Sequence, residues 1–311
     1  MAKINKSHLL GELLLLIATL AWGTSFFILK DTIASAPTFF VLAVRFLISG
    51  VVLGIIFFKK MSKLNKKVLL QGVILGVILA LAYVIQTLGL IYTTPSRNAF
   101  LTASYAVMTP FLYWFFTKNA PKSYSVVSAI LCIVGIGFIS LTSNAGGGLN
   151  YLVGDGLTLI SAIFYALQII YIDKYQTEQK SDSICLLAIE LLTVGVINGI
   201  LSLIFELPKG VEVYALNLDQ ILNICYLTGV CTLVAQFCMI FGQKLTTVNQ
   251  ASLILSLEAV FGAFFSVLFG RETLTVMLVI GFIIVFVAML INEFKIDVLK
   301  PLITLKSNKK K

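Results

Sequence analysis

Long apolar runs, separated by short polar segments, fill almost the whole chain. Ten runs can be delimited, at 9–29, 38–58, 68–90, 98–116, 124–141, 156–172, 183–205, 221–243, 250–269 and 274–291. A helix needs about 20 apolar residues to cross the hydrocarbon core of a bilayer, and each run is close to that length. The pattern therefore predicts an all-α polytopic membrane protein with ten transmembrane helices and no attached soluble domain.

The composition agrees with a membrane protein. Of the 311 residues, 59% are hydrophobic and 12% are charged, and the mean hydropathy is +1.00. A soluble domain carries about twice that charged fraction. The first run continues past Trp22 without the small-residue cleavage site of a signal peptide, so we expect a retained first helix. The only histidine is His8, and the five cysteines form no CxxC pair, so we expect neither a metal site nor a cofactor.

The positive charge, +9 overall, is distributed by side of the membrane. If the N-terminus is cytoplasmic, eighteen Lys and Arg residues lie on the cytoplasmic side and four on the other, namely Lys30, Arg97, Lys209 and Arg271. Cytoplasmic loops of membrane proteins carry such an excess, so both termini are expected in the cytoplasm. The charge therefore needs no nucleic-acid partner, and the partner that we expect is the lipid bilayer. Lys-rich loops favour a bacterial plasma (inner) membrane.

Two segments of the chain resemble each other at a fixed offset. A shift of 153 positions aligns Gly76 with Gly229 and Gly89 with Gly242, and in both copies the second glycine is followed four residues later by a Thr-Thr pair. Shorter offsets extend the match toward the N-terminus, because the second half has longer loops. A chance match of apolar helices explains shared Ala and Val residues but not the spacing of the glycines. We therefore predict an internal duplication.

The duplication divides the chain into a first repeat, 1–145, and a second repeat, 146–294, followed by a basic cytoplasmic tail, 295–311. The segment 143–155 contains three consecutive glycines and is expected to be a flexible link. Each repeat would hold five spans, and an odd number of spans places the second repeat upside down in the membrane. Such an inverted-topology repeat can pack in two related ways, one open to each side, which is the basis of alternating access. Gly76, Gly89, Gly229 and Gly242 would let helices approach closely or slide, although plain tight packing explains them equally well.

Local sequence phrases are similar to those of a known family. The chain resembles the EamA branch of the drug/metabolite transporter superfamily over about residues 9–294. The matching phrases are Ala21-Trp22-Gly23-Thr24-Ser25-Phe26, Arg45-Phe46, Tyr92-Thr93-Thr94, Asn98-Ala99-Phe100-Leu101-Thr102 with Pro110, Leu257-Glu258-Ala259-Val260-Phe261 and Gly270-Arg271-Glu272. The chain departs from the family pattern at Ala259, where proline is frequent, and near Asn119, where a glutamate is frequent. The resemblance implies ten spans in a five-plus-five arrangement, and export or exchange of small metabolites, often amino acids, or of drugs.

Three ionisable residues lie inside predicted spans, where charge is costly and needs a partner or a role. Arg45 and Glu190 align at an offset of 145. We interpret them as structural charges that snorkel or bond to backbone carbonyls of neighbouring helices. Glu258 lies near the middle of its span, and we hypothesise that it binds a substrate amine or takes up a proton during exchange. The alternative is a glutamate that is held by hydroxyls such as that of Ser256 and braces two helices.

Uncharged polar and aromatic residues at comparable depth complete the predicted site. They are Trp22, Tyr83, Gln86, Asn98, Thr102, Tyr105, Tyr165, Gln168, Gln236, Ser252 and Ser256. Aromatic walls with few hydrogen-bonding groups suit an amphipathic organic molecule, and rings can hold a cationic group. Ordinary helix packing is the alternative for about half of these residues.

We therefore expect a secondary active transporter that moves a small organic metabolite, an amino acid or a related amine, as exporter or exchanger. The open alternatives are an uncoupled facilitator or channel and a multidrug exporter of the same fold. No paired catalytic set is visible within the spans, so an enzyme is not expected. A nucleotide-sugar carrier would need several basic residues in the cavity, and only Arg45 is available within a run. The sequence does not fix the oligomeric state, and a monomer is compatible with it.

Overall fold

A computed structural model describes residues 6–118, 120–141, 148–246, 248–271 and 273–294, and these residues are helical almost throughout. In the first half the helices are α1 (Lys6–Ile33), α2 (Thr38–Ile56), α3 (Phe58–Met61), α4 (Lys66–Tyr92), α5 (Pro95–Ala103), α6 (Tyr105–Thr117) and α7 (Ser123–Leu141). In the second half they are α8 (Gly148–Asp173), η2 (Lys174–Glu178), α9 (Ser183–Phe205), η3 (Leu207–Lys209), η4 (Val211–Tyr214), α10 (Leu218–Thr228), η5 (Gly229–Val234), α11 (Ala235–Leu245), α12 (Val248–Ser256), α13 (Glu258–Leu268) and α14 (Val276–Glu293).

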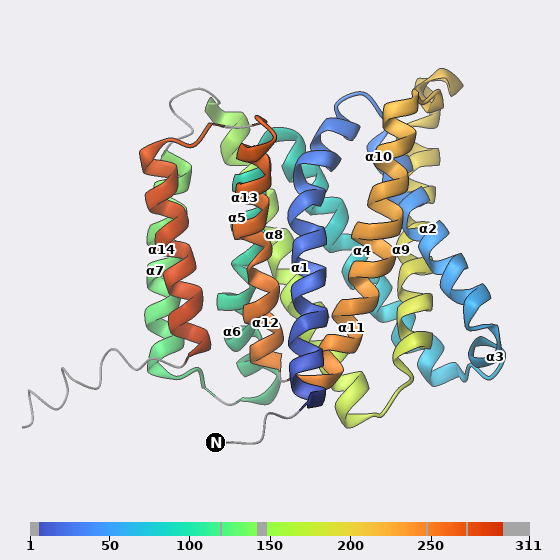
Figure 1. Ribbon diagram of the computed structural model, residues 1–311, viewed down its shortest axis with the longest axis horizontal. Helices are drawn as coiled ribbons and strands as arrows, with labels where there is room; N and C mark the ends of the chain where they lie inside the picture. Colours follow the sequence, from blue (N-terminus) through green and yellow to red (C-terminus); the bar gives the residue numbers. More distant parts are fainter. Residues whose placement is uncertain (1–5, 119, 142–147, 247, 272, 295–311) are drawn as a thin grey trace, which may run out of the picture.

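Most of these helices are membrane spans by length and composition. Seven helical segments of the described residues are long and apolar enough to cross a bilayer, and three shorter apolar ones, Ser123–Ile139, Ile254–Leu268 and Val276–Asn292, accompany them. The long axes run side by side, and α1 begins and α14 ends at the same edge of the molecule, the lower edge in Figure 1. The chain is therefore a multi-pass membrane protein.

Two of the spans are interrupted by a single tight turn. Ser104 separates α5 from α6, and its backbone N–H donates to the Leu101 carbonyl three residues earlier, at 3.3 Å. Leu257 separates α12 from α13 and donates to the Ile254 carbonyl in the same way, at 3.1 Å. A local i to i−3 bond tightens the helix and changes its direction. Each turn brings the first residue of the following helix, Tyr105 or Glu258, toward the interior of the bundle.

A third irregularity lies between α10 and α11, which form one continuous span through the π-helical segment η5. The Thr232 hydroxyl donates to the Leu227 carbonyl five residues earlier, at 2.8 Å, and so satisfies an acceptor in the widened turn. π-helical segments are rare and occur frequently at functional sites.

Pairs of helices from opposite halves of the chain form the body of the bundle. α2 packs on α9, α4 on α8 and α9, α1 on α11 and α13, α5 on α13, and α7 on α14. The last pair stands side by side at the left of Figure 1. Glycines allow several of these close approaches: Gly135 of α7 faces the Gly281 carbonyl of α14, at 3.0 Å from the position that a Cβ would take.

The predicted link at 143–155 is wrong from residue 148 onward. α8 begins at Gly148, so Asp155 is its eighth residue, and it is buried. The glycine run made the start of α8 difficult to predict from the sequence. Glycine disfavours a helix interior but is tolerated in a first turn that tertiary contacts stabilise. The predicted boundary at 145/146 and the tail 295–311 lie outside the described residues.

Candidate functional site

A small enclosed cavity lies where α1, α4, α6, α8, α11, α12 and α13 meet. Eight of the predicted site residues line it: Trp22, Tyr83, Gln86, Tyr105, Tyr165, Gln168, Gln236 and Glu258. About 30 Å³ of the cavity is open to the centres of water molecules, which is room for roughly two waters. The cavity is too narrow for an amino acid in this conformation.

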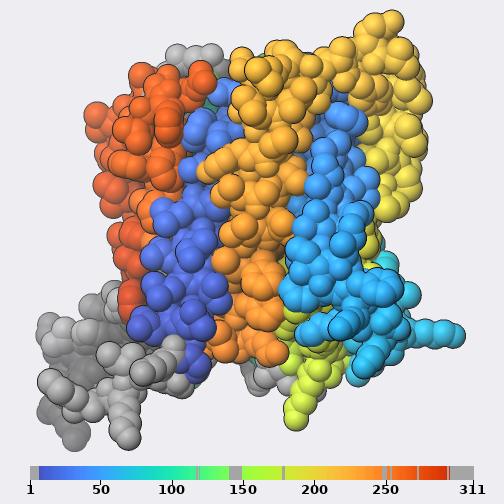
Figure 2. All heavy atoms as spheres, turned by 45° about the vertical axis from the view of Figure 1, so that its right-hand side comes forward, coloured from blue at the N-terminus to red at the C-terminus, as the bar shows by residue number. Residues whose placement is uncertain are grey.

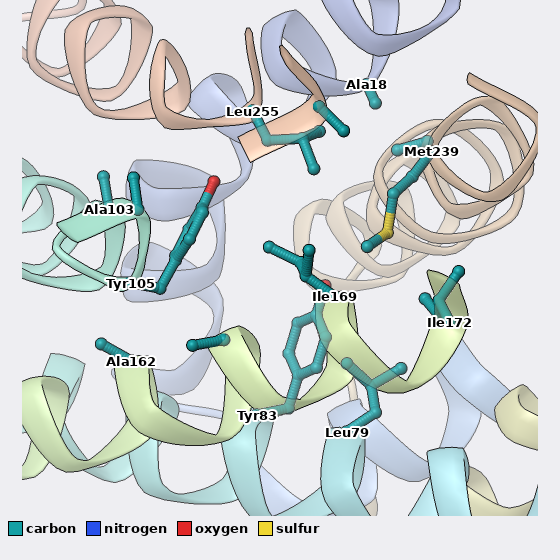
Figure 3. Packing of buried hydrophobic residues seen from close by; sticks show 14 of the residues in the cluster. Ala18, Leu79, Tyr83, Ala103, Tyr105, Ala162, Ile169, Ile172, Met239 and Leu255 are labelled. Carbon is teal, nitrogen blue, oxygen red and sulfur yellow. The ribbon is translucent and has the colours of Figure 1, made fainter. Parts of the chain in front are cut away.

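Aromatic rings of α4, α6 and α8 form one wall of the cavity. The Tyr165 ring meets Tyr83 edge-on at a centroid distance of 5.7 Å and lies 6.4 Å from Tyr105. Figure 3 shows Tyr83, Tyr105, Ile169 and Met239 projecting from different helices toward one central space, with Leu255 above them. The cavity is therefore a junction of several spans rather than a gap beside one helix.

Glu258 is the only carboxylate in the lining of this cavity, within the described part of the chain. It is the first residue of α13, directly after the turn at Leu257, and it is 6% exposed. The Tyr105 phenol lies within hydrogen-bonding range of the carboxylate. The N-terminal end of a helix favours negative charge, which makes this a suitable position for a carboxylate inside a membrane.

A hydrogen-bonded chain stands behind the aromatic wall. The Tyr165 hydroxyl donates to Gln86 Oε1 at 2.7 Å, and Gln86 Nε2 donates to the Thr102 hydroxyl at 2.9 Å. Asn98 Nδ2 donates to the Gln86 carbonyl at 3.2 Å and to the Thr158 hydroxyl at 2.7 Å. Asn98 and Thr102 were predicted to line the cavity but lie behind it. Thr102 holds the Gln86 side chain, and Asn98 bonds to the Gln86 backbone.

Residues of α1 and α11 form another part of the lining. The Gln236 side chain lies within hydrogen-bonding range of the Tyr83 hydroxyl. Trp22 Nε1 donates to the Cys231 carbonyl in η5 at 2.9 Å. Because the π-helical turn leaves this carbonyl available, the indole N–H is satisfied without water, and the ring is held against the cavity.

Ser252 and Ser256 are buried but do not line the cavity. They lie on α12, before the turn that brings Glu258 inward, and only Leu255 of this helix reaches the lining. The prediction placed both serines in the site because of their depth in the span, whereas the break at Leu257 separates the helix that carries them from the helix that begins with Glu258.

Arg45 is 1% exposed and does not snorkel to the membrane surface. Its Nε donates to the Thr232 hydroxyl at 3.1 Å, and the guanidinium carbon lies 5.7 Å from the centroid of the Tyr83 ring. The expected bonds to backbone carbonyls are replaced by a hydroxyl from η5 and the faces of two rings. Since Tyr83 lines the cavity, Arg45 adds positive charge directly behind the aromatic wall.

Glu190 is fully buried and accepts a hydrogen bond from Gln168 Nε2 at 2.7 Å. Gln168 lines the cavity, so Glu190 orients a lining residue from behind, in the way that Thr102 orients Gln86. Glu190 thus contacts the cavity through Gln168, and its structural role stays a prediction.

Three of the four predicted packing glycines lie at close helix contacts. A Cβ at Gly76 would come within 2.4 Å of Thr193, at Gly89 within 2.8 Å of the Gly154 carbonyl, and at Gly242 within 2.6 Å of Leu15. Gly229 is different, because no heavy atom lies within 4 Å of the corresponding position. It begins the π-helical segment, which leaves its surface facing away from other helices, so the prediction of close packing at Gly229 is wrong.

The sequence analysis missed five lining residues, which are Ser25, Phe26, Ile169, Met239 and Leu255. Each lies three or four residues from a predicted member, as Ser25 does from Trp22 and Met239 from Gln236. Residues at this spacing share one face of a helix. Helical spacing from the polar residues was therefore a signal that could have found them.

The sequence analysis also missed a buried ion pair at the edge of the molecule opposite the N-terminus. Arg97 was expected in a loop, but it is the third residue of α5 and is 2% exposed. Its Nη2 pairs with the Asp155 carboxylate of α8, and its Nη1 donates to the Ile139 carbonyl of α7 at 2.6 Å. Thr93 donates to the same carboxylate at 2.9 Å. The group ties together the ends of four helices.

Comparison with known proteins gives a consistent result along the whole chain. The profile of the EamA-like transporter family matches twice, over residues 9–141 and again over residues 152–293. An uncharacterized transporter of Archaeoglobus fulgidus is 28% identical over 289 residues, which cover 93% of this chain and 87% of that protein. The uncharacterized transporter YvbV of Bacillus subtilis is 28% identical over 187 residues, which cover 59% of each chain.

A solved crystal structure shares the fold. It superposes with a TM-score of 0.66 over 91% of this chain and 96% of that chain, at 15% identity. Similarity at this level of identity concerns the arrangement of the helices alone.

Proposed function

Because the chain belongs to the EamA-like transporter family, we propose that it is a secondary active transporter that moves an amino acid or a related amine across the plasma membrane by alternating access. The observation that carries this proposal is the Glu258 carboxylate, buried in the aromatic cavity at a junction of helices from both halves. The bacterial origin, the cytoplasmic placement of both termini and the direction of export or exchange are part of the same proposal.

The chemistry of the cavity favours an amine. A buried carboxylate needs a counter-charge, a proton or hydrogen bonds, and the Tyr105 phenol beside it in the cavity is a potential donor. A primary ammonium group could replace this donor and contact the faces of the surrounding rings, which attract cations. Gln86, Gln168 and Gln236 offer amide donors and acceptors for the uncharged or carboxylate part of the substrate. Proton uptake by Glu258 when the amine leaves would couple transport to protons.

Alternating access in this proposal rests on two inverted five-span repeats. The helix bounds support it: α4 ends at Tyr92 and α11 at Leu245, and the breaks after Ala103 and Ser256 are also 153 residues apart. In Figure 1, α1 runs away from the lower edge and α8 toward it. The two family matches, one in each half, agree with a duplication.

Reciprocal contacts add independent support for the repeat. Gly50 faces Leu192, and Gly195, its partner at an offset of 145, faces Leu47. The position 145 residues after Leu47 is Leu192. The contact of Gly50 with Leu192 and the contact of Gly195 with Leu47 therefore have the same form, with the roles of the two halves reversed. Such a pair is expected of two halves that are related by a pseudo-two-fold axis and is not expected of unrelated packing.

Counterflow in proteoliposomes tests the function. Vesicles that contain the purified protein and are loaded with an unlabelled amino acid or amine should accumulate the labelled compound above its external concentration. Glu258→Gln should abolish accumulation driven by a pH gradient, and Glu212→Gln, a change to an exposed glutamate of η4, should leave it intact. Flux that does not saturate and shows no counterflow would indicate an uncoupled facilitator. Accumulation of bulky aromatic cations but of no amino acid would indicate a multidrug exporter, and an unchanged pH profile in Glu258→Gln would exclude the proton role.

A further inference from the structure

A second hollow, larger than the central cavity, lies at the edge of the molecule where α1 begins. It occupies about 580 Å³ between the α3–α4 segment and the loop that leads into α9. We call it the lysine groove, after the five lysines in its lining: Lys59, Lys60, Lys63, Lys67 and Lys180. Figure 2 shows α3, in light blue, projecting at the lower edge of the molecule beside the yellow-green segment near the start of α9.

The positive charge of the lysine groove is largely unneutralised. Asp182 is the only acidic residue of its lining among the described side chains, and it pairs with Lys60 at 2.9 Å. Asp182 also accepts the backbone N–H groups of Ile184 and Cys185, at 2.9 and 3.2 Å, so its oxygens are occupied by the N-terminus of α9. None of the ion pairs within the described residues involves the other four lysines of the groove.

Two further features indicate that the lysines of the groove are not required for the fold of these loops. Lys180 has φ of 51°, in a backbone region that residues other than glycine rarely adopt, yet the position carries a lysine. The loop after α9, 206–219, corresponds in the second repeat to the lysine-rich segment after α2. It carries Glu206, Glu212 and Asp219 with a single lysine, Lys209. The fold of this loop therefore does not require basic residues.

The surroundings of the groove are apolar on the side of the membrane. Ile55, Ile56 and Phe58, at the end of α2 and the start of α3, are 71%, 65% and 69% exposed. These side chains lie where the chain leaves its second span, so they are in contact with the outer part of the hydrocarbon layer. An occupant of the groove would thus combine a negative head with apolar tails.

We propose that the lysine groove binds the phosphate-bearing headgroup of an anionic phospholipid, with the acyl chains lying along the exposed end of α2. A volume of 580 Å³ is in the usual range of ligand sites. Basic clusters directly beside transmembrane helices bind anionic lipids, and each lysine near the surface strengthens the attraction. The site is distinct from the central cavity and does not depend on what the transporter moves.

Lipid binding can be measured on the full chain in micelles and in nanodiscs. The readouts are lipid adducts in native mass spectrometry and the rise in unfolding temperature when phosphatidylglycerol replaces phosphatidylcholine. We expect wild type to prefer phosphatidylglycerol by at least about tenfold. The variant Lys59→Gln/Lys63→Gln/Lys67→Gln/Lys180→Gln should lose this preference and keep its unfolding temperature in phosphatidylcholine, because Lys60 and its pair with Asp182 remain.

The matched control removes the same charge elsewhere. Lys306→Gln/Lys309→Gln/Lys310→Gln/Lys311→Gln changes four lysines of the C-terminal tail, and it should retain the preference for phosphatidylglycerol. Equal losses in both variants would mean attraction by overall charge and would overturn the site, as would an unchanged preference in the groove variant. Displacement of the lipid by inorganic phosphate at millimolar concentration would identify a free phosphate site and would overturn the assignment to a lipid.

Discussion

Asp155→Asn removes the carboxylate that faces Arg97, and we expect it to open the molecule at the edge opposite the N-terminus. The pair joins the start of α5 to α8, and Arg97 continues the connection to the Ile139 carbonyl at the end of α7. These contacts exist only while the helix ends are together. In an alternating-access cycle, their free energy therefore stabilises the conformation that is closed at this edge.

The size of the effect follows from burial. The Arg97 and Asp155 side chains are 3% and 4% exposed, and removal of one partner of a buried pair costs about 3–5 kcal/mol. Since about 1.4 kcal/mol changes an equilibrium tenfold, the ratio of open to closed forms should rise by roughly 10²–10³. The pair of Asp31 with Arg271 at the same edge is 34% and 53% exposed. Its loss in Asp31→Asn should cost at most about 1 kcal/mol.

Cysteine accessibility reports this equilibrium. In a variant whose native cysteines are replaced, Ser25→Cys places one thiol in the lining of the central cavity. An impermeant thiol reagent, added on the side where Arg97 lies, should label the Asp155→Asn variant at least about tenfold faster, and the Asp31→Asn variant almost as slowly as the parent. The double change Arg97→Gln/Asp155→Asn leaves no unpaired charge and should still label quickly. A lower unfolding temperature with an unchanged labelling rate would refute the reasoning, because the pair would then be a static brace.

Two further predictions concern stability. Gly281→Ala should lower the unfolding temperature, since a Cβ there would lie 2.8 Å from the Ile139 side chain and overpacking costs about 1–3 kcal/mol. Gly137→Ala, where no heavy atom lies within 4 Å, is the control, and equal shifts of the two variants in the same detergent would contradict the packing. Asp182→Asn should destabilise the protein near neutral pH and lose its effect in strong acid. Burial raises the pKa of Asp182, but the bond to Lys60 and the backbone N–H groups of α9 outweigh it and lower the pKa below 3.8. The stabilising contribution is therefore present above pH 3.8 and lost as the pH falls through the lowered pKa, so a difference from wild type that persists at about pH 2 in thermal melts would contradict it.

The hydropathy pattern predicted a multi-pass helical membrane protein, because the length and apolar content of spans are set by the bilayer rather than by tertiary contacts. It could not reveal the turns at Ser104 and Leu257 or the π-helical segment at Gly229, since these residues have no strong preference for such turns. The π-helical segment has a partner from elsewhere in the chain, the Trp22 indole, which bonds to the Cys231 carbonyl. The local sequence determines which segments are helical, and contacts in the assembled bundle determine where these helices break.

The candidate site was predicted unevenly for a related reason. Glu258, Tyr105 and Tyr165 could be selected because polar and aromatic side chains at mid-membrane depth need partners. Asn98 and Thr102 are also polar residues at mid-membrane depth. Only the rotation of their helix, which the structure shows, places them behind Gln86. The pair of Arg97 and Asp155 was missed because each residue was taken for part of a loop, one after Pro95 and the other after a glycine run. Sequence indicates depth, and the rotation of each helix then determines which residues meet.

The two ends of the proposed repeat differ at the positions of the Arg97 pair, and this difference leads to a last prediction. Arg97 is the third residue of α5, and the third residue of α12, at an offset of 153, is Gln250. Asp155 corresponds, at an offset of 143, to Glu12 of α1, which lies 3.3 Å from His8. α1 packs on α12, but glutamine cannot form the ion pair. Among the ion pairs of the described residues, the one that is buried lies at the edge with Arg97, and we predict that the protein rests closed there.

Gln250→Arg would place a cation at the position of the second repeat that corresponds to Arg97 at the offset of 153. If the repeat is inverted, as we propose, a pair of this arginine with Glu12 should stabilise closure at the edge where α1 begins and so raise the labelling rate of the cavity thiol from the Arg97 side. Glu12→Gln in the same chain should cancel the increase, because the introduced arginine would again lack a partner. An increase that survives Glu12→Gln would show that the arginine acts through another contact, and no increase at all would mean that the two edges are not related by the repeat.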